Sequence, residues 1–169
     1  MIELPAELTV QDPQQMNALA RSIASELRAG DVILLTGELG AGKTTFTRGL
    51  GAALEVRGAV TSPTFVLART HPRLEPGQPA LVHVDAYRLS SAVELDDLDI
   101  DFARSIVVVE WGAGLVDELT DSWLSITIDR PRGAGHNRVD EQAGPDDGYD
   151  EEPIEPRRVS IEGVGPRWA

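Results

Sequence analysis

A glycine-rich segment, GELGAGKT at residues 37–44, constrains this chain more than any other feature of its sequence. It matches the pattern G-x-x-x-x-G-K-[ST] at every fixed position, follows the apolar run at residues 31–36 and opens a helical pattern at residues 44–54. Glycines let such a turn wrap closely with its backbone N–H groups pointing inward, toward the positive end of the following helix. The segment therefore predicts a polyphosphate-binding loop between a buried strand and a helix.

The residues expected to bind nucleotide are this loop and the threonine after it. Lys43 is the only lysine in a chain with 15 cationic residues. Its presence points to a role that a flexible ammonium fills better than a planar guanidinium, namely contact with the β- and γ-phosphates. The Thr44 hydroxyl is the expected magnesium ligand, whereas Thr45 either contributes to the site or only caps the helix. The expected nucleotide-binding residues are Gly37, Glu38, Leu39, Gly40, Ala41, Gly42, Lys43, Thr44 and Thr45.

Two acidic residues stand where apolar runs end. Asp85 closes the run LVHVD, and Glu110 closes the run VVVE. A phosphate-binding loop needs an acid at the end of a neighbouring buried strand to hold Mg²⁺ through its water shell. Both acids should emerge at the edge of the sheet where ligands bind, so we expect a catalytic or metal role for each. Either could also be an ordinary acid at the end of a strand.

The segment TSPTF, residues 61–65, lies between the loop helix and Asp85, which is the chain position of a switch that senses the γ-phosphate. Thr64 is its candidate catalytic residue, although the same pattern also suits a plain turn around Pro63. Trp111 alone favours packing, and His83 is expected to face a partner or the rim of the site. The histidines show no metal-binding spacing.

Short strands and helices alternate along most of the chain, and buried apolar strands with interleaved helices favour an α/β fold. We expect a single domain over residues 1–169, with a mostly parallel central sheet and flanking helices. Strands are expected at residues 7–10, 31–36, 64–70, 80–84, 105–109, 123–128 and 159–163. Helical segments are expected from Asp12-Pro13 to Leu27 with a stop at Gly30, and at residues 44–54, 92–98 and 102–104.

The charge of the chain is acidic and unevenly distributed. Of the net charge of −13, residues 132–156 carry −6 in a stretch rich in glycine and proline. Such a composition cannot bury enough apolar surface to offset its ordering entropy, so a flexible acidic loop is expected there. The overall acidity also argues against a general nucleic-acid-binding surface, since phosphate groups would be repelled.

Several classes of protein are excluded by what the sequence lacks. With no cysteine, the chain has no disulfide, iron–sulfur cluster or thiolate zinc site. No apolar run approaches the roughly 20 residues of a membrane span, and the first residues do not form a signal peptide. We therefore expect a cytoplasmic protein that does not interact with membranes.

Four segments together resemble the TsaE family (older name YjeE), small bacterial ATPases needed to make threonylcarbamoyladenosine in tRNA. These segments are LLTGELGAGKTTFTRGL, VTSPTFVL, VHVDAYRL and VVVEWG, at residues 34–50, 60–67, 82–89 and 107–112. Their order and spacing fit the family from about Leu8 to Ile128, and the last three are far more specific than the phosphate loop alone.

The resemblance implies a single P-loop domain that binds ATP and ADP with Mg²⁺ and hydrolyses ATP weakly by itself. It also implies work with the TsaB–TsaD pair, which transfers the threonylcarbamoyl group to tRNA, so that tRNA is reached only through that complex. Carried over residue by residue, it makes Lys43 the loop cation, Thr44 the metal hydroxyl, Asp85 and Glu110 the acids at the metal, Thr64 part of the switch-like segment and Trp111 part of a functional Glu-Trp pair.

Two other functions compete with this interpretation. A P-loop kinase would transfer the γ-phosphoryl group to a small molecule, but such kinases usually carry an arginine-rich lid where this chain is acidic. A non-catalytic nucleotide-sensing adaptor would use ATP only to shape an interface. Turnover of ATP without an added acceptor distinguishes the first, and tolerance of Asp85 or Glu110 substitutions would favour the second.

Overall fold

The computed structural model describes residues 2–38, 40–58, 60, 67–130 and 156–169. Leu39, the switch-like segment with Thr64, and the expected acidic loop up to residue 155 lie outside these residues. The predictions made for them stay predictions. Among the described residues, no helix is long and apolar enough to cross a membrane.

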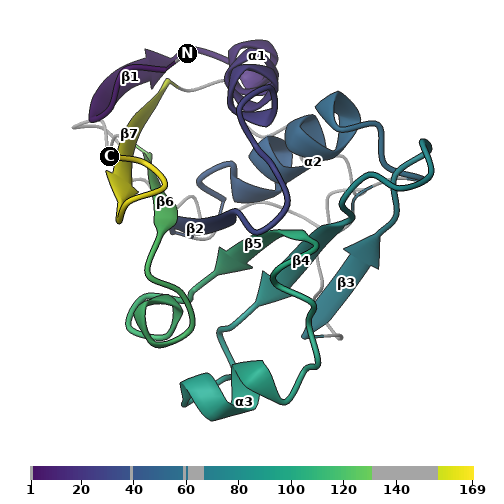
Figure 1. Cartoon of the computed structure of the whole chain (residues 1–169). Helices are drawn as coiled ribbons and strands as arrows, with labels where there is room; N and C mark the ends of the chain where they lie inside the picture. Colours follow the sequence, from purple (N-terminus) through teal and green to yellow (C-terminus); the bar gives the residue numbers. More distant parts are fainter. Residues whose placement is uncertain (1, 39, 59, 61–66, 131–155) are drawn as a thin grey trace, which may run out of the picture.

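Seven strands of the described residues form one mixed sheet in the order β1-β7-β6-β2-β5-β4-β3 (Figure 1). The four central strands run parallel, and three outer strands add antiparallel. The parallel strands are β6 (Trp123–Asp129), β2 (Val32–Gly37), β5 (Ile106–Glu110) and β4 (Leu81–Asp85). The antiparallel strands are β1 (Ala6–Val10), β7 (Arg157–Val164) and β3 (Ala68–His71). The predicted α/β fold with a mostly parallel centre is confirmed.

Helices cover both faces of the sheet. The helices α1 (Pro13–Ala24) and α2 (Lys43–Ala53) lie side by side against one face, as Figure 1 shows. The short helix α3 (Ala92–Asp96) and the 3₁₀ turn η1 (Val116–Glu118) contribute to the core on the opposite face. Strands covered on both faces need apolar side chains at every position, which explains the continuous apolar runs that the sequence showed.

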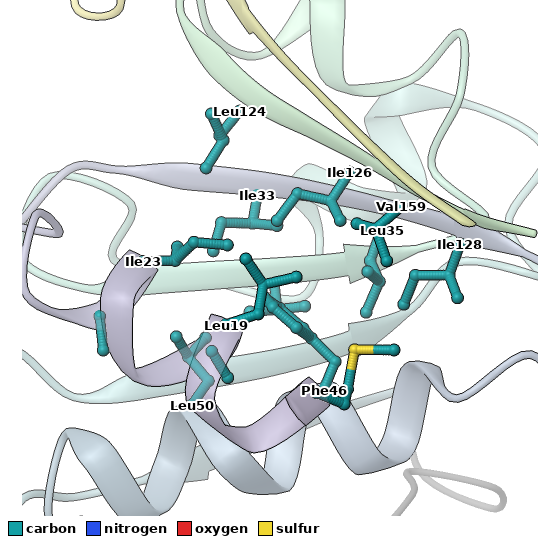
Figure 2. Close-up of a cluster of buried hydrophobic side chains, with 14 of the residues drawn as sticks. Leu19, Ile23, Ile33, Leu35, Phe46, Leu50, Leu124, Ile126, Ile128 and Val159 are labelled. Atoms are coloured by element: carbon teal, nitrogen blue, oxygen red, sulfur yellow. The ribbon is translucent and has the colours of Figure 1, made fainter. Parts of the chain in front are cut away.

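Strand β2 illustrates this arrangement. Ile33 and Leu35 pack toward α1 and α2, where they meet Phe46 and Leu50 (Figure 2). Val32 and Leu34 pack into the cluster on the other face. All four side chains are buried, so β2 is fixed on both faces and carries the glycine-rich loop on a rigid base.

Helix α1 begins where the sequence indicated and ends earlier. The Asp12 carboxylate accepts a hydrogen bond from the Gln15 N–H at 2.8 Å, with Pro13 at the first helical position. The expected continuation to Leu27 is wrong, because the helix ends at Ala24. The Glu26 and Leu27 N–H groups bond to carbonyls three residues back, which tightens the chain out of the α-helical path.

Two further expectations are corrected. Residues 102–104 form a turn rather than a helical segment, with the Arg104 N–H bonded to the Asp101 carbonyl. Three residues are too few to repay helix nucleation without a longer apolar face. Leu67 lies in a bend before β3, so the strand expected over residues 64–70 begins at Ala68 and extends to His71.

Candidate functional site

The glycine-rich loop leaves the carboxyl end of β2 and enters α2 directly. Gly37 is the last residue of β2, and a Cβ there would lie 2.8 Å from the Ile128 carbonyl oxygen, so only glycine fits against β6. Gly40 and Gly42 have φ angles of 80° and 109°, the left-handed region that glycine tolerates. These positions therefore need the glycines that the motif supplies.

The first turn of α2 is left open to a ligand by its own sequence. The N-caps Asp12 of α1 and Ser91 of α3 each accept a hydrogen bond from a first-turn N–H. The N-cap of α2 is Gly42, which has no side chain to do so. Unpaired N–H groups at a helix start carry partial positive charge and suit an anion. Thr44 and Thr45 stand in this turn, both half-buried.

Lys43 is the first residue of α2, and its side chain is almost fully buried at 8% exposure. Burial lowers the pKa of the Lys43 ammonium below its ordinary value, while the carboxylates of Glu110 and Asp85 oppose that shift. The Nζ atom lies 3.9 Å from the centroid of the Trp111 ring, a cation–π contact. The loop lysine thus faces the two predicted acids and an aromatic ring.

The two acids lie directly beside each other. Asp85 and Glu110 are the last residues of β4 and β5 and form a register pair in the parallel sheet. Glu110 is 5% exposed, whereas Asp85 is half-buried and accepts a hydrogen bond from the Tyr87 N–H at 3.0 Å. The sequence predicted that each acid ends a strand, and the structure places both at the carboxyl ends of neighbouring strands, close to Lys43.

His83 lies beneath this pair on β4 and is completely buried. Its Nε2 atom is 3.3 Å from the Glu110 Oε2 atom, and neither ring nitrogen has a well-formed hydrogen bond among the described residues. The expectation that His83 faces a partner or the rim of the site is wrong, because it sits behind Glu110 in the interior.

Trp111 follows Glu110 with a φ angle of 61°, a left-handed conformation that is strained for a tryptophan. Its ring is 43% exposed and meets Tyr87 edge-on, with centroids 5.5 Å apart. This conformation turns the ring out of the sheet and over Lys43. Strained residues of this kind gather at functional sites.

Arg157 is the residue at the site that the sequence analysis missed. It begins β7, is 8% exposed and donates hydrogen bonds to the carbonyls of Ala41 and Gly40 in the glycine-rich loop. A signal was present in the sequence. Arg157 alternates with Val159 and Ile161 and so occupies a core-facing position on the strand. An arginine is rarely buried at such a position unless it is paired with a polar group.

The donor set suits Mg²⁺ bound together with a polyphosphate. Among the described residues, no group of three or more acids and histidines is arranged to hold a metal ion by itself. Magnesium is usually held by one or two carboxylates, water and substrate phosphates rather than by an all-protein cage. The Thr44 hydroxyl and the carboxylates of Asp85 and Glu110 fit that chemistry.

A family model described as "Threonylcarbamoyl adenosine biosynthesis protein TsaE" matches residues 10–138. The chain belongs to the TsaE family. The matched range contains the glycine-rich loop, both acids and Trp111, so the family resemblance seen in the four sequence segments is confirmed.

Several relatives carry the name tRNA threonylcarbamoyladenosine biosynthesis protein TsaE. The Streptomyces coelicolor protein is 54% identical over 157 residues, which cover 91% of this chain and 94% of that protein. The Mycobacterium tuberculosis protein is 49% identical over 120 residues, covering 66% of this chain and 71% of the relative. The crystal structure of Bacillus subtilis YdiB superposes with a TM-score of 0.63 and 27% identity, covering 99% of this chain and 92% of YdiB. This TsaE chain therefore shares the family's fold over nearly its whole length.

Proposed function

We propose that this TsaE chain is a magnesium-dependent ATP-binding and ATP-hydrolysing protein that acts with the TsaB–TsaD complex in threonylcarbamoyladenosine modification of tRNA. Its membership of a threonylcarbamoyladenosine biosynthesis family supports the pathway. One observation carries the biochemical part of the proposal. Lys43, the only lysine of the chain, lies buried at the start of an uncapped helix and faces two adjacent carboxylates.

In this proposal the loop N–H groups and Lys43 bind the phosphates of ATP. The ammonium stabilises charge that develops on the β- and γ-phosphates, which is worth more in a buried site than in water. Thr44, Asp85 and Glu110 hold Mg²⁺ directly or through its water shell. When bound there, Mg²⁺ would supply positive charge that neutralises the polyphosphate.

Hydrolysis by the isolated chain should be slow. The two acids next to Lys43 are both assigned to the metal, which leaves few groups to orient an attacking water unaided. Nucleotide hydrolases with incomplete sites are usually completed by a partner. We assign that part to the TsaB–TsaD complex, and tRNA contact to the complex rather than to this acidic chain. The protein should accordingly work in the cytoplasm.

The test measures phosphate release from ATP by the purified chain, alone and with TsaB–TsaD, together with threonylcarbamoyladenosine formed in tRNA. Turnover that is low alone and rises with the partners supports the proposal, and Lys43→Ala is the inactive control. Phosphate transfer to a small molecule in place of water would instead identify a kinase. Full tRNA modification by Glu110→Gln and Asp85→Asn variants that bind ATP but do not hydrolyse it would identify a nucleotide-sensing adaptor.

A further inference from the structure

Arg157 links the last strand of the sheet to the glycine-rich loop. Its Nε atom donates to the Ala41 carbonyl oxygen at 3.0 Å, and its Nη2 atom donates to the Gly40 carbonyl oxygen at 3.4 Å. The side chain is 92% buried, and 116 residues separate it from Ala41. The fork of a single guanidinium thus contacts two successive peptide groups of the loop.

The sheet topology explains how Arg157 reaches that place. Strand β7 runs antiparallel to β6, which runs parallel to β2. The first residue of β7 therefore lies at the edge where β6 and β2 end and where the loop begins. Arg157 faces the same side of the sheet as Val159 and Ile161, both fully buried. A cation at a core-facing position costs free energy unless its donors are satisfied, so this burial is tied to the loop carbonyls.

Because peptide groups are planar, the hydrogen bonds from Arg157 to the two loop carbonyls also fix the direction of the adjacent N–H groups. In a trans peptide the carbonyl and the following N–H point in opposite directions. With the Ala41 carbonyl held on Arg157, the Gly42 N–H is directed away from the guanidinium. With the Gly40 carbonyl held as well, the peptide between Gly40 and Ala41 is oriented too, and the Ala41 N–H closes a turn on the Glu38 carbonyl at 3.0 Å. Two peptide planes of the loop are fixed from outside it.

We propose that Arg157 is a positioning residue that holds the peptide planes of the glycine-rich loop in the orientation that binds phosphate. The inference rests on the proposed nucleotide-binding function in one respect, that the oriented Gly42 N–H binds phosphate while the Ala41 N–H holds the turn to Glu38. A glycine-rich backbone is otherwise free to sample many conformations, and ordering it only on binding would weaken affinity. Arg157 orders the loop before the nucleotide arrives.

The neighbouring arginine is a matched control. Arg158 has the same side chain on the same strand but faces the other way, 66% exposed, and pairs with Glu7 at 3.3 Å on the surface. Exposed pairs of this kind contribute little. Replacement of either arginine by glutamine removes one positive charge from β7, and only the Arg157 change removes the loop contacts.

The experiment combines hydrogen exchange without nucleotide and calorimetric binding of Mg·ADP. In Arg157→Gln we expect about tenfold faster exchange in the loop peptide covering residues 37–46 and about tenfold weaker ADP binding. Arg158→Gln should match the parent protein in both. Arg157→Lys keeps the charge but not the fork, so it should restore neither property. It also serves as the test variant if the glutamine variant fails to fold.

Unchanged loop exchange in Arg157→Gln would overturn the inference, as would full recovery of loop exchange and ADP affinity in Arg157→Lys. The second result would show that only the positive charge matters. The exchange measurement needs no nucleotide, so it still tests the positioning role if the parent protein binds no ADP. In that case the proposed nucleotide-binding function fails separately.

Discussion

Buried charged side chains lie at both ends of strand β2, but they differ in whether they are paired with an opposite charge within the chain. At the amino end, just before β2, Asp31 is 3% exposed and has its acceptors filled. Both of its carboxylate oxygens accept hydrogen bonds from Arg167 at 2.9 Å, and one also accepts the Arg28 N–H at 2.8 Å. Arg167 in turn donates to the Glu26 carbonyl at 2.8 Å. Both Asp31 carboxylate oxygens, and the Nε and Nη2 atoms of Arg167, thus have partners within the chain.

At the carboxyl end of β2 the charged groups are close together but not joined in this way. Among the residues that the structure describes, no ion pair within 4 Å connects Lys43 to Glu110 or Asp85, and Lys43 stacks on Trp111 instead. The buried Lys43 ammonium therefore contacts an aromatic ring rather than a carboxylate, which suits a site that an anionic ligand completes in the proposed function. The comparison assigns the Asp31 end to stabilising the fold, and it supports the proposal that the Lys43 end binds the nucleotide.

Replacement of Lys43 should show the difference between the two ends most clearly, because it should affect activity and not stability. Lys43→Ala should abolish ATP turnover in the presence of TsaB–TsaD, a loss of at least about 100-fold, because the charge on the phosphates loses its stabilising ammonium. The melting temperature should stay equal or rise, since the buried ammonium has no direct ion pair to lose. Lys43→Arg is the matched control for charge alone. Restored turnover in it would show that a lysine is not needed.

Removal of the ion pair at the amino end of β2 should have the reverse effect, lowering stability without changing activity. Asp31→Ala leaves Arg167 without its buried partner and should lower the free energy of unfolding by about 3 kcal/mol, measured by urea denaturation. ATP turnover of the folded protein should be unchanged. Asp101→Ala, which breaks an exposed pair with Arg104, is the control and should change stability little. A large loss of turnover in Asp31→Ala would mean that the ends are coupled.

The acids at the carboxyl end should affect turnover more than binding. Glu110→Gln and Asp85→Asn keep the shape of the side chains but remove charge beside the metal, so we expect turnover to fall about tenfold or more. Nucleotide affinity should fall less, because the loop N–H groups remain. Asp97→Asn changes an exposed acid after α3 and serves as the control. Normal turnover in either test variant would assign that acid a structural role.

The sequence predicted the parts of this molecule that depend on local pattern. The continuous apolar run of β2 and the helix that follows the glycine-rich segment are each encoded in adjacent residues, and both are confirmed. The sequence also predicted that Asp85 and Glu110 each end a strand, which is confirmed, whereas their pairing in register is a finding of the structure.

What escaped prediction depends on contacts between distant segments. The bond from Arg157 to Ala41 spans 116 residues and requires knowing that β7 joins the sheet beside β6. The left-handed backbone of Trp111 is fixed by surroundings that no local preference encodes. Helix α1 ends at Ala24 although its apolar spacing continues to Leu27. The sequence could not show this, because the spacing of apolar side chains does not reveal that the backbone changes to hydrogen bonds three residues back.

A smaller effect concerns His71, a buried histidine of β3 whose Nε2 atom has no partner among the described residues. Burial lowers the pKa of His71 below its ordinary value of 6.5, and His83 and Arg69 add to the shift. Below pH 6.5, His71 is protonated in the unfolded chain but stays neutral in the folded chain until the pH reaches its lowered pKa. The free energy of unfolding therefore falls as the pH falls from 6.5 to that lowered pKa. His71 pairs in register with Leu81, at the amino end of β4, away from the acids.

The matching variant is His71→Gln, whose unfolding free energy should depend less steeply on pH between 6.5 and the lowered pKa of His71. ADP affinity should stay unchanged, which would show that His71, like Asp31, affects stability and not nucleotide binding. Urea denaturation at a series of pH values measures the slope for both proteins. An equal slope in the two proteins would show that His71 does not titrate differently on folding.

The contrast between the two ends is tested most directly by calorimetric titration of Mg·ADP into the parent protein, Lys43→Ala and Asp31→Ala, each at a temperature where it is folded. We predict equal affinity for the parent protein and Asp31→Ala, and no detectable binding to Lys43→Ala although it melts as late as the parent protein. Parent-like ADP affinity in Lys43→Ala would contradict the assignment of the carboxyl end of β2 as the nucleotide site.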